Sequence, residues 1–259
     1  LQVAAPSADS NIDGIRQFIQ PVNYLMLGTG GNLTFDYAND FATETDKFTY
    51  LTPNVQGFQA GVSYTPDVQS GVAHALQGVN RDGIGNYNDA WEVAARYEGQ
   101  MDELGVNLGA GYTTANKASG VGAGREDLEE WNIGADFDWG PFGLGAVYTE
   151  NDSGSSANNR DDNETWVVGL DYTTGPFKVG GSYYTNENDD GVGVATAGND
   201  LDTDRWTGGV NYSFGPGMSF RGSVSYIDHE LSGGDTFTGS GNDDEAEATS
   251  FLLGTQINF

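Results

Sequence analysis

The sequence predicts an all-β protein, and more specifically a transmembrane antiparallel β-barrel. Three observations predict this fold: residues that suit strands and turns are abundant, apolar and polar residues alternate in many segments, and the connections between these segments alternate between short and long. The 259 residues include 39 Gly, 13 Phe, 13 Tyr and 5 Trp. No run of about 18 apolar residues occurs, which excludes a spanning helix. Because only alternate residues of a barrel strand face lipid, a mean hydropathy of -0.45 is compatible with a membrane protein.

The segment 131–139 shows the alternation clearly. One face carries Trp131, Ile133, Ala135, Phe137 and Trp139, and the other carries Asn132, Gly134, Asp136 and Asp138. Aromatic residues at both ends of an apolar face are typical of the girdles where a membrane-spanning strand meets the two interfaces. This segment therefore predicts a strand with one face in lipid.

Ten further segments share this layout, which gives about eleven strands in all. In chain order they are 47–52, 58–64, 91–97, 106–112, 142–148, 166–172, 177–183, 205–214, 220–226 and 250–259. Each has about the length that a tilted strand needs to cross a bilayer. The last segment places Phe251, Leu253, Ile257 and Phe259 on its apolar face, with Leu252 as the exception.

The connections alternate in length, which is independent support for the barrel. Short turns are expected at 54–57, 100–104, 140–141, 175–176 and 215–217. Long polar loops are expected at 67–88, 114–127, 151–163, 186–202 and 228–245. Short periplasmic turns and long outer loops are the arrangement of outer-membrane barrels, so the last strand should run toward the periplasm.

Composition excludes several functions. The formal charge of -28, from 38 acidic and 10 basic residues, argues against nucleic acid and favours cations as partners. The absence of cysteine excludes disulfides, thiolate zinc sites and cysteine nucleophiles. His74 and His229 fall in predicted outer loops, and the glycine-rich stretch 120–124 lacks the lysine and helix of a phosphate loop. We therefore predict that the protein is not an enzyme.

Three stretches carry a family resemblance. They are YLTPNVQGFQAGVSYTPD at 50–67, Gly-Pro-Gly at 215–217 and the terminal Ile257-Asn258-Phe259. The first looks like the central hairpin of Gram-negative outer-membrane porins of the alphaproteobacterial general-diffusion type, and the last is similar to the C-terminal assembly signal of such barrels, with Phe259 as its aromatic residue. The resemblance implies sixteen antiparallel strands, a homotrimer and an external loop folded into each lumen.

On this resemblance residues 1–259 form a single barrel domain, in which 6–46 are the inward-folded constriction loop and 47–259 the strands and outer loops. About five early strands are then missing, and eleven strands do not close a barrel, so we expect the full polypeptide to be longer. Residues 1–5 would be the end of the fifth strand. Alternatively, 1–5, 23–27 and 32–37 are additional strands, which would give fourteen.

The alternation also assigns the residues that face the lumen. Inward positions include Lys47, Glu92, Arg96, Glu98, Asp136, Asp138, Asp171, Lys178, Arg205 and Arg221. In the family, acids on the inward loop oppose bases on the wall across the constriction, which creates a transverse field. The loop candidates here are Asp9, Asp13, Asp36 and Asp40, and the wall candidates are Arg96, Lys178, Arg205 and Arg221. The simpler interpretation is a solvated wall that tolerates any polar side chain.

The predicted function is passive diffusion of small hydrophilic solutes and ions through a cation-preferring pore in the Gram-negative outer membrane, with no required cofactor. Dense acids in the outer loops could bind Ca²⁺ that bridges lipopolysaccharide, or could form only a solvated, repulsive rim. The candidate ligands are Asp161, Asp162, Asp189, Asp190, Asp243 and Asp244. Two alternatives remain, namely a substrate-selective channel and a secreted acidic Ca²⁺-binding β-sandwich or adhesin.

Overall fold

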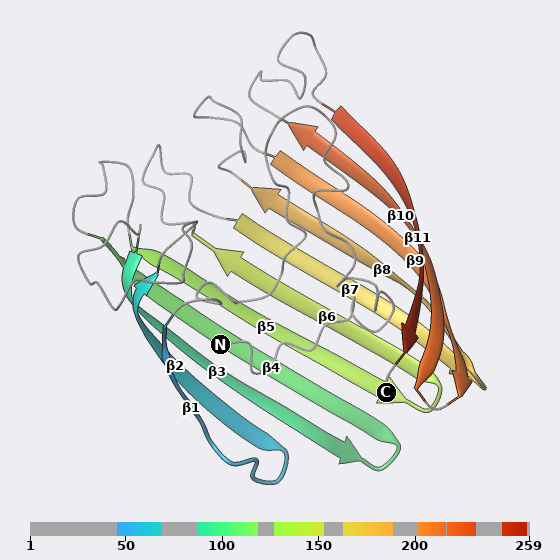
Figure 1. The fold of residues 1–259 in the computed structure, drawn as a ribbon, viewed down its shortest axis with the longest axis horizontal. Coiled ribbons are helices and arrows are strands. Elements are labelled where there is room, and N and C mark those ends of the chain that lie inside the picture. Colours follow the sequence, from blue (N-terminus) through green and yellow to red (C-terminus); the bar gives the residue numbers. More distant parts are fainter. Residues whose placement is uncertain are drawn as a thin grey trace.

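The computed structural model describes residues 46–68, 87–118, 127–152, 163–188, 201–215, 217–231 and 245–257. These residues form one antiparallel sheet in which eleven strands pair in chain order and curl around a common interior (Figure 1). The strands are β1 (Phe48–Leu51), β2 (Phe58–Val68), β3 (Tyr87–Met101), β4 (Leu104–Lys117), β5 (Leu128–Trp139), β6 (Phe142–Asn151), β7 (Asn163–Thr174), β8 (Phe177–Asn188), β9 (Leu201–Gly215), β10 (Met218–Leu231) and β11 (Glu245–Ile257). The predicted antiparallel fold and strand number are confirmed.

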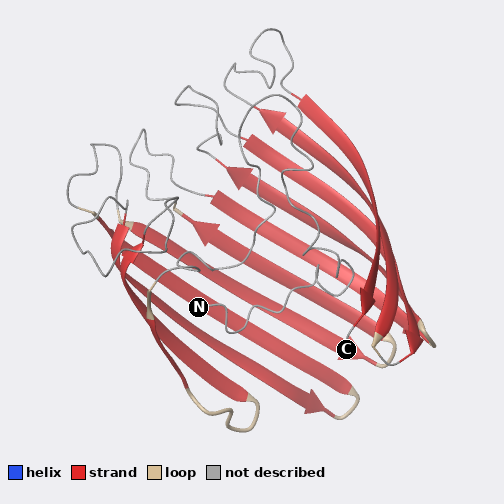
Figure 2. Ribbon diagram, viewed as in Figure 1, coloured by secondary structure: helices blue, strands red, loops and turns tan. Residues whose placement is uncertain are grey.

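The described part of the chain contains strands, turns and no helix (Figure 2). Accordingly, none of its segments is a helix with the length and apolar character that crossing a membrane requires. The sheet is open, because β1 and β11 each pair with a single strand among the described residues. The predicted additional strands at 1–5, 23–27 and 32–37 and the inward loop at 6–46 lie outside the described residues, apart from Asp46.

The short connections gather at one end of the sheet (Figure 2). Two of them are Gly-Pro pairs: Gly140-Pro141 joins the paired residues Trp139 and Phe142, and Gly175-Pro176 joins β7 to β8 in the same way. Both glycines have a positive φ, 58° at Gly140 and 54° at Gly175. A positive φ followed by the fixed negative φ of proline is the geometry of a type II′ hairpin turn, whose twist matches that of the strands. The predicted positions of these turns are confirmed.

The two faces of the sheet differ in chemistry as the alternation predicts. On β5 the outward Trp131 and Ile133 are 39% and 53% exposed, whereas Asn132 between them and Asp136 further along the strand are buried. The strands from β2 to β10 repeat this pattern, with apolar residues exposed on one face and polar residues shielded on the other. The shielded face is the concave one, because curvature crowds inner side chains together and spreads outer ones apart.

Aromatic residues form two belts on the outer face. Near the turn end, Phe142 and Tyr172 have ring centroids 5.0 Å apart, and Phe177 stands 4.7 Å from Tyr212. Toward the other end, Tyr148 lies between two tryptophans, with centroids 4.9 Å from Trp131 and 4.5 Å from Trp166. Tyr64–Trp91 and Tyr183–Trp206 extend this second belt. Belts at both ends of an apolar band are typical of strands that span a bilayer.

The Gly-Pro turns give a direct test of the hairpin geometry. A methyl group at Gly140 would meet no atom within 4 Å, so Gly140→Ala changes only the backbone preference. Since an L-residue at positive φ costs about 1–2 kcal/mol, we expect this loss in urea unfolding of the lipid-reconstituted protein. Gly208→Ala is the matched control, because its site on β9 is equally open and its φ is not in the left-handed region. Equal stabilities of the two variants would contradict the assigned turn.

Candidate functional site: the polar inner wall

The inner face of the sheet is predominantly polar. Its buried members include a serine, threonine or asparagine on β2 and on every strand from β4 to β10, together with ionisable residues such as Glu92 on β3 and Asp171 on β7. A soluble β-sandwich would show the reverse arrangement, with apolar residues shielded and polar residues exposed. Trp166 and Trp206 instead remain 49% and 58% exposed, and the described residues supply no second sheet to cover them. The geometry is that of a wall between lipid and water.

Strand β3 and Lys47, the residue before β1, carry paired charges of both signs. The Lys47 Nζ atom lies 3.7 Å from Glu92 Oε2, and Glu92 is almost completely shielded. Arg96 Nη1 lies 3.2 Å from Glu98 Oε1, two residues further along β3 on the same face. This part of the wall is therefore locally neutralised.

From β5 to β7 the charged residues of the inner face are all acidic. They are Glu130, Asp136, Asp138 and Asp171. Amides on neighbouring strands bind two of them: Asn151 Nδ2 donates to Glu130 Oε2 at 2.6 Å, and Asn107 Nδ2 donates to Asp136 Oδ2 at 3.3 Å. These carboxylates are held in place by neutral donors.

From β8 to β10 the charged residues of the inner face are all basic. We call these basic residues of β8–β10 the basic strip, and the acidic residues of β5–β7 the acidic strip. Lys178 Nζ lies 3.2 Å from Asp171 Oδ1, so this ion pair stands where the two strips meet. The Arg205 guanidinium carbon lies 5.2 Å from the ring centroid of Tyr184, a cation–π arrangement that holds the arginine against the wall. Arg221 on β10 pairs in register with Asn211 on β9.

The four predicted wall bases lie on the inner face but do not form one cluster. Arg96 is on β3, far around the sheet from Lys178, Arg205 and Arg221 on the consecutive strands β8, β9 and β10. The loop candidates Asp9, Asp13, Asp36 and Asp40 lie outside the described residues, as do the calcium candidates Asp161, Asp162, Asp189, Asp190, Asp243 and Asp244, and Phe259. Their roles stay predictions. The part of the chain that the structure describes holds no group of three His, Cys, Asp or Glu residues suited to a metal ion.

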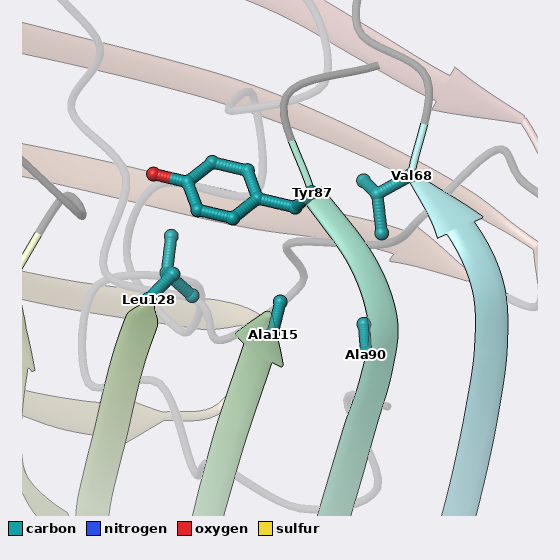
Figure 3. Packing of buried hydrophobic residues seen from close by; sticks show 5 residues of the cluster. All are labelled: Val68, Tyr87, Ala90, Ala115 and Leu128. Atoms are coloured by element: carbon teal, nitrogen blue, oxygen red, sulfur yellow. The ribbon is translucent and has the colours of Figure 1, made fainter. Parts of the chain in front are cut away.

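Two apolar clusters on the inner wall were not singled out from the sequence. Val147, Val167, Tyr184 and Ile227 lie on β6, β7, β8 and β10, are at most 1% exposed, and pack with Ala248 of β11. The second cluster comprises Val68, Tyr87, Ala90, Ala115 and Leu128 (Figure 3). The alternation of apolar and polar residues separates the two faces of a strand, but it contains no information on which inward side chains pack together across strands.

An acidic row crosses the outer face of the sheet beyond the aromatic belt. Pairing places six carboxylates side by side on consecutive strands, namely Glu150, Glu164, Glu187, Asp202, Glu230 and Glu245. Tyrosines of the belt donate to outer-face acids at this end, with Tyr148 bound to Glu150 at 2.8 Å and Tyr226 to Glu247 at 2.6 Å. Charged side chains on the lipid-facing side are costly in hydrocarbon, so this row marks where the sheet leaves the hydrocarbon. Like charges directly opposite each other also repel.

A curled antiparallel sheet with an apolar, belted exterior and a polar interior defines the class of outer-membrane β-barrels. The sequence matches the Gram-negative porin family over residues 4–231. The chain therefore belongs to the Gram-negative porin family, and its location is the outer membrane.

Sequence relatives cover part of the chain. An uncharacterized protein of Rickettsia felis is 25% identical over 158 residues, which are 44% of this chain and 36% of that protein. A second, from Rickettsia prowazekii, is 24% identical over 160 residues, with 45% and 36% covered. The matched region thus spans about a third of the length of these curated relatives.

Solved structures with a similar fold are porins and outer-membrane channels. The anion-selective porin from Comamonas acidovorans has a TM-score of 0.51 and 16% identity, with 88% of this chain and 65% of that chain covered. The in-vitro folded outer-membrane protein OmpT of Vibrio cholerae has a TM-score of 0.53 and 16% identity, with 90% and 69% covered. The outer-membrane channel DcaP of Acinetobacter baumannii has a TM-score of 0.53 and 12% identity, with 89% and 64% covered. At these identities the likeness concerns the fold alone.

The acidic row predicts a stabilising substitution. Glu187 faces Glu164 on one side and Asp202 on the other, so Glu187→Gln removes two repulsive pairs. We expect the free energy of unfolding to rise by up to about 1 kcal/mol at low salt, and the gain to shrink as salt screens the row. Glu103→Gln, in the β3–β4 turn away from the row, makes the same chemical change and should have little effect. A destabilised Glu187→Gln protein would show that these acids attract rather than repel.

Proposed function

We propose that this chain forms the wall of a water-filled outer-membrane pore through which small hydrophilic solutes and ions diffuse passively, without catalysis or energy input. The observation that carries the proposal is the sheet itself, whose exposed face is apolar while its shielded face is polar and charged. Such a wall lowers the cost of placing water and ions inside a membrane. Membership of the porin family supports the same conclusion.

The two open edges of the sheet require partners. In hydrocarbon each unpaired backbone group costs several kcal/mol, and both β1 and β11 have an unpaired side among the described residues. We propose that further strands of the same polypeptide pair with both edges and close the barrel. Three such barrels then associate as a homotrimer, which is the assembly implied by the family resemblance.

The pore is proposed to prefer cations. The chain has a formal charge of -28, and the inner face of β5–β7 carries four carboxylates without a base. Fixed negative charge along a pore wall raises the local concentration of cations and lowers that of anions. The acids of the outer loops are proposed to bind divalent cations that bridge anionic lipopolysaccharide, since hard cations prefer carboxylate oxygens.

Residues 6–46 are proposed to fold into the lumen as the constriction loop. The support is the apolar cluster of Val147, Val167, Tyr184 and Ile227, which is almost completely shielded although it lies on the inner face of a single-layer sheet. An apolar wall of this kind favours a packed segment over water. Asp9, Asp13, Asp36 and Asp40 would then reach the constriction and add to its negative charge.

Cation preference can be measured from the reversal potential of the reconstituted pore under a potassium chloride gradient. Neutralising the acidic strip with Asp138→Asn and Asp171→Asn should lower the cation-to-anion permeability ratio by roughly twofold. Asp228→Asn combined with Glu230→Gln removes two negative charges from the outer face of β10 and should leave the ratio nearly unchanged. Anion preference in the unmodified pore would refute the proposal.

The inward position of residues 6–46 can be tested by cysteine labelling, because the chain contains no cysteine. A thiol reagent added from water should modify Thr173→Cys, which is exposed on the inner face, and should barely modify Val167→Cys in the apolar cluster. Deleting residues 6–46 should make position 167 reactive. Equal labelling of both positions in the intact protein would show that nothing covers the cluster.

A further inference from the structure

One apolar cluster on the inner wall lies where the long connection 69–86 leaves and rejoins the sheet. We call it the mouth patch, and it comprises Val68, Tyr87, Ala90, Ala115 and Leu128. In Figure 3 the Tyr87 ring extends from the start of β3 toward Leu128 at the start of β5. The patch thus crosses the neighbouring strands β2 to β5 at the end of the sheet opposite the short turns.

The mouth patch is shielded although the sheet is a single layer. Its side chains are at most 7% exposed, and they include a tyrosine and a leucine. By contrast, the inward Thr173 near the turn end of β7 is exposed. A single layer covers a side chain from one side only, and apolar surface that faces water is unfavourable. A further apolar segment is therefore required over the patch.

Polar atoms beside the patch also require partners. Thr65, which pairs with Ala90, is fully buried, and its Oγ1 atom has no hydrogen-bond partner within the described part of the chain. Both carboxylate oxygens of Asp67, the residue before Val68, are shielded and have no partner there either. Buried acceptors in folded proteins are nearly always hydrogen-bonded. The segment that covers the patch must therefore also supply N–H or O–H donors.

The connection 69–86 has the position and the length for this role. It leaves the sheet at Val68 and returns at Tyr87, which pair with each other and both belong to the patch. From β2 to β5 the patch spans three strand spacings, about 14 Å. A helix over residues 72–79 alone would be about 12 Å long. The connection can therefore reach across the whole patch.

The composition of this connection also differs from that of the others. Among the connections between the described strands, it alone contains leucine or isoleucine, at Leu76 and Ile84. Four of its apolar residues follow the three- and four-residue spacing of one helical face, namely Val72, Ala75, Leu76 and Val79. Such a face matches the apolar surface of the mouth patch.

We propose that residues 69–86 fold back onto the mouth patch and line the outer mouth of the pore. Val72, Leu76 and Val79 pack on the patch, and backbone N–H groups of the segment donate to the Asp67 carboxylate. The segment occupies space inside the mouth and therefore limits the size of the solutes that enter. This effect on solutes rests on the proposed pore function, whereas the docking itself does not.

Cysteine labelling tests the docking, because the chain contains no cysteine. In vesicles containing the full-length protein, a water-soluble maleimide should modify Leu128→Cys roughly tenfold more slowly than Thr173→Cys, since a covered site reacts only when its cover opens. Adding Leu76→Asp places a charge in the apolar contact and should largely remove this protection. Val192→Asp makes a matched change in the connection 189–200 and should leave the protection intact.

A second variant and a second measurement complete the test. Deletion of residues 71–84 should also expose Leu128→Cys, and it replaces Leu76→Asp if that variant does not fold, as judged by heat-dependent mobility in detergent gels. In liposome swelling, either change should raise the rate with the trisaccharide raffinose relative to that with arabinose by about twofold, because a wider mouth favours the larger solute. Val192→Asp should not change this ratio.

The outcomes separate the docking from the pore. Fast labelling of Leu128→Cys in the otherwise unmodified protein overturns the docking, and so does protection that survives deletion of residues 71–84. Protection that is lost on deletion of residues 6–46 but not of 71–84 assigns the patch to that other segment and also overturns the proposal. An unchanged sugar ratio after undocking overturns the size limit. No swelling with any sugar overturns the pore, while the labelling still decides the docking.

Discussion

The hydrocarbon of a bilayer contains no water to bind backbone N–H and C=O groups, and the rest of the structure depends on this constraint. An antiparallel sheet satisfies those groups between strands, as in the continuous register from Met218 to Glu230 against β11. Once strands are used, successive side chains must point to opposite faces. The chain exploits this by giving lipid one chemistry and water the other, so a sequence of low mean hydropathy can still build a membrane wall.

The inner face is then free to carry charge, and the structure shows that its charges are ordered rather than scattered. Paired acids and bases at Lys47 and on β3 give way to acids on β5–β7 and to bases on β8–β10, with the Lys178–Asp171 ion pair at the boundary. Strand pairing fixes this order, because it sets which side chains are neighbours around the wall. The Lys178–Asp171 ion pair neutralises charge only where the two strips meet. The remaining charged residues of each strip still produce an electrostatic field in the lumen.

The alternation in segments such as 131–139 was enough to predict the strands, their two faces and their number, because lipid imposes one simple rule on every spanning strand. The Gly-Pro turns were predictable for a similar local reason. Contacts across strands were not. The row from Glu150 to Glu245, the cation–π contact of Arg205 with Tyr184 and the cluster around Val167 depend on register, which is set by pairing over the whole sheet. The loop candidates such as Asp36 lie outside the described residues, so their role rests on the family resemblance.

The central claim is that the apolar face of the sheet contacts lipid, and tryptophan fluorescence tests it most directly. All five tryptophans of the chain lie on this face and are exposed, namely Trp91, Trp131, Trp139, Trp166 and Trp206. In vesicles made with brominated phospholipids, whose acyl chains quench nearby indoles, the account predicts strong loss of this fluorescence and weak quenching by aqueous acrylamide. Fluorescence that brominated lipids leave unchanged and acrylamide quenches would contradict it.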